Sequence, residues 1–182
     1  MSTSTLMTAE QLFELSPRLA RAELIEGELR EMSPSSLDHI IIAGRLITRL
    51  GAFVYERQLG EVGSSEGGFI IQRDPDTVLA PDVVFISQKR LAQIRGPKGF
   101  AVGTPDLAVE VLSPDDRPKE LERKAERWVN ADVRLVWVIN PRSRTAMIYR
   151  PGVDPVTISA DDDLTGEDVV PGFRCRLGGL LP

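Results

Sequence analysis

The stretch from residue 104 to residue 128 constrains the fold of this chain more than any other part of the sequence. Its first half, Asp106 to Leu112, begins with an aspartate and continues as an aliphatic run that contains one carboxylate, Glu110. A second apolar run, Arg134 to Asn140, contains Leu-Val-Trp-Val-Ile. Continuous apolar runs of this length are typical of strands that are covered on both faces. We therefore expect two buried strands here.

A helix is expected between these two strands, and further elements surround them. Pro118 suits the first turn of a helix that runs to Asn130. A longer helix with a broad apolar face is expected from about Leu37 to about Arg57. The remaining expectations are a capping box and short helix at 8–15, strands at 22–32 (as a pair), 69–71, 78–87 and 145–150, a turn or edge region at 60–68, and short strands in 156–181. This order predicts an α/β fold of the mixed α+β kind, with a mixed β-sheet flanked by helices, in a single domain over residues 1–182.

Composition narrows the class of protein. The 182 residues carry 22 Lys and Arg against 27 Asp and Glu. The net charge of −5 argues against tight non-specific binding of nucleic acid but leaves room for a local basic groove. No apolar run approaches the ~18 residues that span a membrane, and the N-terminus lacks a secretory signal pattern. The only cysteine, Cys175, allows no intrachain disulfide and no cysteine zinc site. We expect a cytoplasmic protein.

Two charged residues of the central stretch occupy unusual positions. Side chains alternate along a strand, so Glu110 shares a face with Asp106 and Ala108 inside the aliphatic run. A glutamate is seldom fully buried unless it is paired or binds a metal, so Glu110 either forms an ion pair or belongs to a site. Lys124 lies at the edge of the apolar face of the following helix, four residues before Trp128. It either extends its amine into solvent or turns it toward the core.

Asp82 is the third candidate. It follows Pro81 and precedes the apolar run Val-Val-Phe-Ile, so it is either a turn acid or a carboxylate at a strand entry that projects into a cleft. Two carboxylates can hold Mg²⁺ together with water and a substrate phosphate. A nearby lysine could orient the attacking water or stabilise charge that develops on the phosphate.

At these residues the sequence resembles the Uma-two family, whose members are classed as restriction endonucleases of the PD-(D/E)XK nuclease superfamily. The resemblance covers nearly the whole chain, and its most specific parts are residues 110–114 and 135–141. The matching segments are Pro81-Asp82, 106–114, Lys124, 135–141, 23–29, Met32-Ser33-Pro34, His39 and Pro171-Gly172-Phe173. The resemblance implies a restriction-endonuclease-like fold.

The resemblance also assigns roles. It implies that Asp82 is the first acid of the nuclease motif and Glu110 the second, with the main-chain carbonyl of Val111 as a further metal ligand. The usual lysine would stand two residues after Glu110, where this sequence has Leu112. In this family the lysine moves to the following helix, which points to Lys124.

Other residues compete for these roles. Asp106 also follows a proline, but it lies ~13 Å along the same strand from Glu110, so we prefer Asp82. His39, the only histidine, is either structural or at the edge of the site, and Glu28 is an alternative carboxylate on the metal side. Trp128 stands where the family resemblance leads us to expect an aromatic residue. Cys175 is interpreted as a small packing residue.

The leading hypothesis is therefore a Mg²⁺- or Mn²⁺-dependent endonuclease, a hydrolase that cleaves phosphodiester bonds of DNA. A homodimer is the expected state, because double-strand cutting suits two copies of one site. One alternative is a non-catalytic module of the same fold that binds nucleic acid or supports assembly. A purely structural oligomer is the third possibility.

Overall fold

The computed structural model describes residues 6–19, 21–32, 34–64, 67–94, 99–114 and 116–182. Ser33, which is part of the family resemblance, lies outside these ranges. The helices are α1 (Ala9–Leu15), α2 (Leu37–Glu56), α3 (Gln88–Ile94), α4 (Pro118–Asn130) and the 3₁₀ turns η1 (Ser16–Arg18) and η2 (Leu177–Gly179). The strands are β1 (Ala22–Ile25), β2 (Glu28–Glu31), β3 (Gly60–Ser64), β4 (Phe69–Gln72), β5 (Thr77–Leu79), β6 (Val83–Ser87), β7 (Ala101–Val102), β8 (Leu107–Val111), β9 (Leu135–Asn140), β10 (Thr145–Arg150), β11 (Val153–Ser159), β12 (Asp163–Thr165) and β13 (Arg174–Arg176).

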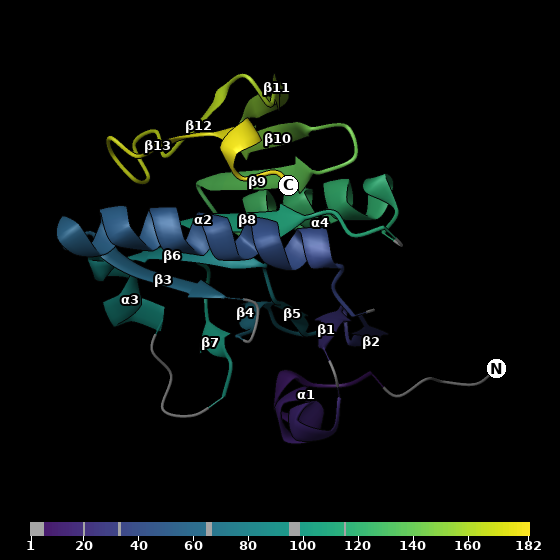
Figure 1. The fold of residues 1–182 in the computed structure, drawn as a ribbon. Helices are drawn as coiled ribbons and strands as arrows, with labels where there is room; N and C mark the ends of the chain where they lie inside the picture. The colour runs from purple at the N-terminus through teal and green to yellow at the C-terminus, as the bar shows by residue number, and fades with distance from the viewer. Residues whose placement is uncertain (1–5, 20, 33, 65–66, 95–98, 115) are drawn as a thin grey trace.

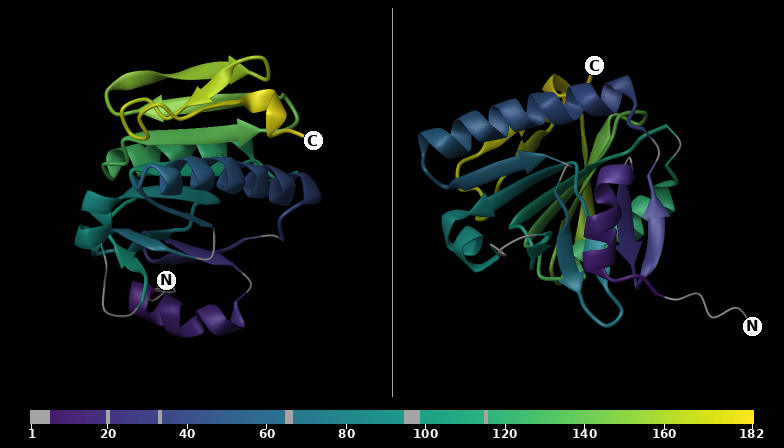
Figure 2. Two further views of the ribbon diagram at one scale, coloured as in Figure 1. Left: turned by 60° about the vertical axis from the view of Figure 1, so that its left-hand side comes forward. Right: turned by 90° about the horizontal axis from the view of Figure 1, so that it is seen from below.

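The larger sheet is the centre of the fold, with strand order β11-β10-β9-β8-β6-β3. Its strands pair antiparallel except for β8 and β9, which are parallel and are joined through α4. The long helix α2 crosses one face of the sheet and α4 lies against the other (Figures 1 and 2). The two apolar runs of the sequence are thus neighbouring central strands covered on both sides, as expected, and the mixed sheet with flanking helices is confirmed.

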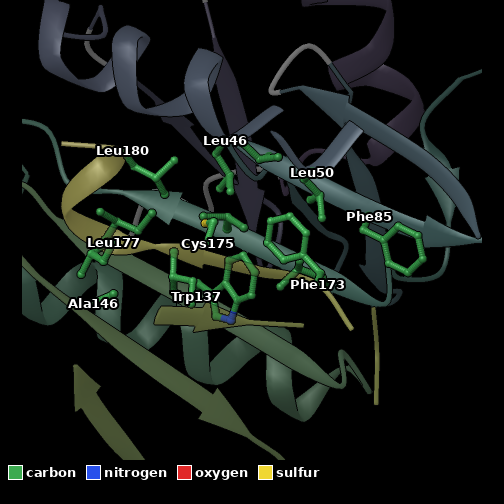
Figure 3. Close-up of a cluster of buried hydrophobic side chains, with 14 of the residues drawn as sticks. Leu46, Leu50, Phe85, Trp137, Ala146, Phe173, Cys175, Leu177 and Leu180 are labelled. Carbon is green, nitrogen blue, oxygen red and sulfur yellow. The ribbon is translucent and has the colours of Figure 1, made fainter. Parts of the chain in front are cut away.

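Side-chain alternation along β8 divides the core into two clusters. Leu107, Val109 and Val111 pack with α2, in a cluster that also contains Trp137. Ala108 packs on the opposite face, with Trp128 of α4. Figure 3 shows the α2 side, where Leu46 and Leu50 meet Trp137, Phe173 and the C-terminal segment. Cys175 lies in this cluster as a buried packing residue, and burial raises the pKa of its thiol to about 11.

A second sheet lies below the first in Figure 1, with strand order β2-β1-β5-β4-β7. Helix α1 packs on it through Ala9 and Leu12, which meet Leu24, Ile70 and Val78. The capping box that was expected at Thr8 and Gln11 begins this helix. This layer places β1 beside the segment that connects β5 to β6, where Glu23 accepts the N–H of Ala80.

The single strand expected from residue 78 to residue 87 was wrong. The chain forms β5 in the second sheet, leaves it at Ala80, and enters the larger sheet as β6. Pro81 has no N–H to donate to a strand ladder, which favours a break at this point. On either side of it, Ala80 donates its N–H to Glu23 Oε1 at 2.7 Å, and Asp82 donates its N–H to the carbonyl of Val109 at 2.9 Å. The crossing therefore places Asp82 where the two sheets meet.

Other element boundaries agree closely with those expected from the sequence. The α2 helix is capped by Ser36, whose hydroxyl accepts the N–H of His39, and α4 has the predicted bounds. The region 60–68, expected as a turn or edge, contains the edge strand β3. Among the described residues, no helix is both long and apolar enough to cross a membrane.

Candidate active site

Glu110 is the buried centre of the candidate site. It lies on the face of β8 that α4 covers, and its side chain is almost fully buried, with 2% of the residue exposed. Lys124 donates to Glu110 Oε2 at 2.8 Å, and the Trp128 indole N–H donates to Oε1 at 2.8 Å. Residues four positions apart share one helix face, so a single turn of α4 supplies both donors. The tryptophan thus orients the carboxylate while the lysine neutralises it.

Lys124 points into the protein. Only 6% of it is exposed, and its amine donates to Glu110, to Glu23 Oε1 at 2.8 Å and to the carbonyl of Ala80 at 3.1 Å. An ammonium group has three N–H donors, so this arrangement satisfies all of them. The alternative of an amine extended into solvent is excluded. The amine is therefore held in place by β8, by β1 and by the crossing between the sheets.

Asp82 lies at the same junction, and three N–H donors hold it. Its Oδ2 accepts the main-chain N–H of Val111 at 2.8 Å. Its Oδ1 accepts from the Arg21 guanidinium at 3.0 Å and contacts His39 Nε2 at 3.1 Å. Asp82 is thus tied directly to the residue that follows Glu110 in the sequence.

Two serines support the donors of Asp82. The hydroxyl of Ser35 accepts from Arg21 at 3.0 Å, and Ser113 Oγ lies 3.2 Å from His39 Nδ1. Ser35 lies just before α2 and Ser113 just after β8. The imidazole is therefore held on both ring nitrogens, between the start of α2 and the end of β8.

Burial and the surrounding charges set the protonation of Glu110 and Lys124. Burial raises the pKa of Glu110 to about 8, and Asp82 and Glu23 act in the same direction against the attraction of Lys124. Burial opposes charge on Lys124, but Glu110, Glu23 and Asp82 outweigh it, so the pKa of Lys124 lies above its usual range. The cluster therefore contains a charged lysine and a glutamate that takes up a proton more readily than an exposed glutamate does.

Asp82 responds in the opposite sense. Burial acts to raise the pKa of Asp82, but the hydrogen bond and charge of His39, the charge of Lys124 and the N–H of Val111 outweigh it. The pKa of Asp82 therefore lies below its usual range, and this carboxylate is ionised across the physiological range. Two carboxyl groups whose surroundings push their pKa values apart are typical of catalytic centres.

The donor set fits a hard divalent cation. Mg²⁺ in proteins is usually held by one or two carboxylates, with water and phosphate completing the shell. A carboxylate oxygen has two lone pairs, and within the described ranges Asp82 Oδ2 and each Glu110 oxygen accept one hydrogen bond apiece. One lone pair on each stays available. Within the described ranges, no group of three or more His, Cys, Asp or Glu side chains is arranged to hold a metal ion. A Mg²⁺ site does not need three such side chains, because water and phosphate complete its shell.

The competing candidates lie elsewhere or at the edge. Asp106 is at the opposite end of β8, where it accepts the N–H of Ser87 and pairs with Arg90, and this is a structural role. Glu28 is exposed and pairs with Arg30. His39 does reach Asp82.

Sequence reasoning missed two members of the cluster, Glu23 and Arg21. Glu23 is part of the family resemblance but received no role, and Arg21 was not singled out. Both belong to the second sheet or its approach, so their proximity to Asp82 and Lys124 depends on long-range packing. The one local signal is that Glu23 is a carboxylate between the apolar residues Ala22 and Leu24 of a short strand.

A solved crystal structure shares this architecture. It is described as a putative nuclease belonging to DUF820 from Anabaena variabilis ATCC 29413. The likeness has a TM-score of 0.77 and 17% sequence identity, and it covers 92% of this chain and 96% of that chain. The mixed sheet and its flanking helices therefore have the same fold as that protein.

The family follows from the sequence match. The family model Uma2, described as "Putative restriction endonuclease", matches residues 9–178. The chain belongs to this family, which confirms the resemblance seen in the sequence. No curated protein matches the chain.

Proposed function

We propose that this protein is a metal-dependent endonuclease that hydrolyses phosphodiester bonds of DNA, with Asp82, Glu110 and Lys124 as catalytic residues. The observation that carries the proposal is the 2.8 Å contact between the Lys124 amine and Glu110 Oε2. The amine reaches this carboxylate from α4, although Leu112 occupies the strand position where the lysine of the motif usually stands. Membership of a restriction endonuclease family supports DNA as the substrate.

Asp82 and Glu110 would hold Mg²⁺ or Mn²⁺, with the main-chain carbonyl of Val111 as a further ligand. Val111 is the last residue of β8, and its N–H already binds Asp82 Oδ2 at 2.8 Å. Both acids are therefore tied to the same end of one strand. Such an ion, when bound, supplies a water of lowered pKa and neutralises charge on the phosphate oxygens. Loss of the Glu110 proton would accompany binding, because metal ligation needs the carboxylate.

Lys124 would position the attacking water or stabilise charge on the phosphate. Its pKa lies above the usual range, so it stays charged and does not act as a general base. Because its three N–H groups already have acceptors, it would donate to a water or phosphate oxygen by exchanging one of them. Glu23 and the carbonyl of Ala80 hold the amine together with Glu110, which fixes its position. A preorganised donor of this kind lowers the barrier without reorganisation during the reaction.

A homodimer is part of the proposal, since a double-strand cut needs two active sites. Light scattering should then give twice the 20.1 kDa of one chain. The competing hypothesis is a non-catalytic module that binds nucleic acid or supports assembly. One argument for it was that the lysine of the motif is absent from position 112. This argument is weaker because the Lys124 amine lies 2.8 Å from Glu110.

The proposal is tested by cleavage of supercoiled plasmid with added Mg²⁺ or Mn²⁺. Glu110→Gln and Lys124→Met should each lower the cleavage rate by about 100-fold or more, because each removes a group that acts in the transition state. Glu28→Gln is the matched control, because Glu28 is an exposed carboxylate on the neighbouring β2 strand. Circular dichroism before the assay identifies variants that fail to fold.

Two results would contradict the proposal. Cleavage by Glu110→Gln at the wild-type rate would show that Glu110 takes no part in catalysis. Wild-type protein that binds DNA at low salt, but leaves it intact with every divalent cation tried, would favour the non-catalytic alternative.

A further inference from the structure

A cavity of about 220 Å³ opens beside the candidate active site. Leu12 and Phe100 contribute apolar surface to its lining, and Ala22, Gly68 and Ala80 contribute small side chains or bare backbone. Arg21 is the charged group of the lining. Pockets for drug-sized ligands measure ~300–1,000 Å³, so this cavity suits one ring system and is too small for a whole nucleotide.

Two residues belong to both the cavity and the acid–lysine cluster. Arg21 lines the cavity and also donates to Asp82 Oδ1 at 3.0 Å. Ala80 lines the cavity, and its carbonyl accepts from Lys124 at 3.1 Å. The cavity therefore borders the acid–lysine cluster at the Arg21 side chain on one side and at the Ala80 peptide group on the other. A group bound here could belong to the same nucleotide strand as a phosphate at the cluster.

The guanidinium of Arg21 has an unused donor. Its terminal nitrogens bind Ser35 and Asp82, but its Nε is buried and has no hydrogen-bond partner within the described part of the chain. The part of this side chain that is exposed, 22% of it, is what can meet a ligand in the cavity. Each terminal nitrogen of a guanidinium carries two N–H groups, so a ring nitrogen or carbonyl oxygen of a ligand could accept from the second N–H of Nη1 or Nη2.

The aromatic wall of the cavity is held firmly. The Phe100 ring packs edge-to-face on Phe13, with 5.3 Å between ring centroids. It also lies so close to Gly68 that a Cβ there would come within 2.7 Å of the ring. A glycine at this position lets the ring sit against bare backbone. The cavity thus combines a fixed aromatic ring and a guanidinium group in a space of about 220 Å³.

We propose that this cavity binds a nucleobase of the DNA strand whose phosphate is cut, and this inference rests on the proposed function. A base offers a π-face to Phe100 and ring acceptors to the exposed part of the Arg21 guanidinium, and it is attached to the strand whose phosphate the acids would receive. Base–aromatic stacking tolerates any base, so the cavity would position the strand without selecting a sequence. It would also add base-dependent affinity to a protein whose net charge is −5.

The test compares binding of two single-stranded 12-mers with nuclease-resistant phosphorothioate backbones in the presence of Mg²⁺. One carries thymine at every position, and the other is fully abasic, so the two have the same charge. Fluorescence anisotropy gives both dissociation constants for wild type, for Phe100→Ala and for Ala22→Leu, which fills the cavity. Matched controls are Phe53→Ala, which removes a phenylalanine that packs on Phe173, and Ala52→Leu on the exposed face of α2.

Wild type and both controls should bind the thymine strand about tenfold more tightly than the abasic strand. Phe100→Ala and Ala22→Leu should reduce this ratio to about twofold and leave abasic binding unchanged, which also shows that they fold. Equal affinity of wild type for the two strands, or a ratio that both cavity variants preserve, would overturn the nucleobase site. Plasmid cleavage by the same wild-type protein would then leave the proposed function standing. Absence of binding to both strands, and of cleavage, would remove the two together.

Discussion

Lys124 and Glu110 lie 2.8 Å apart, although 14 residues separate them in the sequence and they belong to a helix and a strand. In the common arrangement of the motif, the lysine stands two residues after the second acid and shares its strand. Here α4 packs on the face of β8 that carries Ala108 and Glu110, so the Lys124 amine reaches Glu110 from the helix. The same chemical pair is thus built from a different element, and Leu112 is left to fill the core.

Removal of the Lys124 charge should destabilise the fold. Lys124→Met leaves Glu110 and Glu23 buried without their shared cation, and we expect a loss of about 3 kcal/mol in the free energy of unfolding. This is the low end for a broken buried pair, because Glu110 can take up a proton. Urea denaturation at pH 7 without divalent cations measures it, with exposed Lys119→Met as the control. A loss that is no greater than in the control would show that the buried pair contributes nothing to stability.

The pKa of Glu110, raised to about 8 by burial, predicts a pH dependence of stability. Between its unfolded value of 4.5 and about 8, the folded state holds more protons than the unfolded state, so stability falls as pH rises. The raised pKa of Lys124 and the lowered pKa of Asp82 act outside this window. In metal-free buffer, the free energy of unfolding should decline from pH 5.5 to pH 8. Glu110→Gln should flatten the decline, and an equal slope in that variant would contradict the assignment.

The indole of Trp128 should matter through its N–H as well as its bulk. Trp128→Phe keeps most of the apolar contact with Phe69 and Ala125 but removes the hydrogen bond to Glu110 Oε1. We expect a loss of about 1–3 kcal/mol, because a buried acceptor loses its partner. Thermal or urea unfolding measures this, and Trp137→Phe is the informative comparison. The indole N–H of Trp137 has no partner within the described residues, so its loss should cost less.

Glu23 should affect catalysis through Lys124. Glu23→Gln keeps an acceptor for the Ala80 N–H but removes one of the two carboxylates that contact the amine. We expect cleavage to slow by about tenfold with little change in DNA affinity, since the amine loses its orientation and the strand contacts remain. Separate measurement of the single-turnover rate and of binding distinguishes this from damage to the fold. A proportional loss of binding would indicate a structural role.

Much of the central framework was predictable, because it depends on local patterns. Alternation along β8 places Glu110 opposite Val109 and Val111, and the helical spacing of Lys124 and Trp128 places both on the buried face of α4. These patterns are short-range, and the aliphatic surroundings leave a buried carboxylate few partners. A strand entry was one of the two alternatives that the sequence left open for Asp82.

The rest depended on contacts between distant segments. Glu23 and Arg21 reach the site only because β1 joins the second sheet, and that sheet meets the first at the crossing from Ala80 to Asp82. Residues 78 to 87 are apolar except for Pro81, Asp82 and Ser87. The two halves of this stretch have the same apolar character, so little in the local sequence shows that they belong to different sheets. Sheet partners are set by packing across the whole chain, which periodicity does not describe.

The most direct test of the central claim is the position of Mn²⁺ in a crystal of the wild-type protein, located by anomalous diffraction. The proposed function predicts one strong peak at about 2.0–2.3 Å from oxygen atoms of both Asp82 and Glu110, with the Lys124 amine beside it. Arg21 or His39 should shift from Asp82 Oδ1 if that oxygen also joins the ion. A peak at other residues, or none at a Mn²⁺ concentration that supports DNA cleavage, would contradict the assignment of these acids as the metal site.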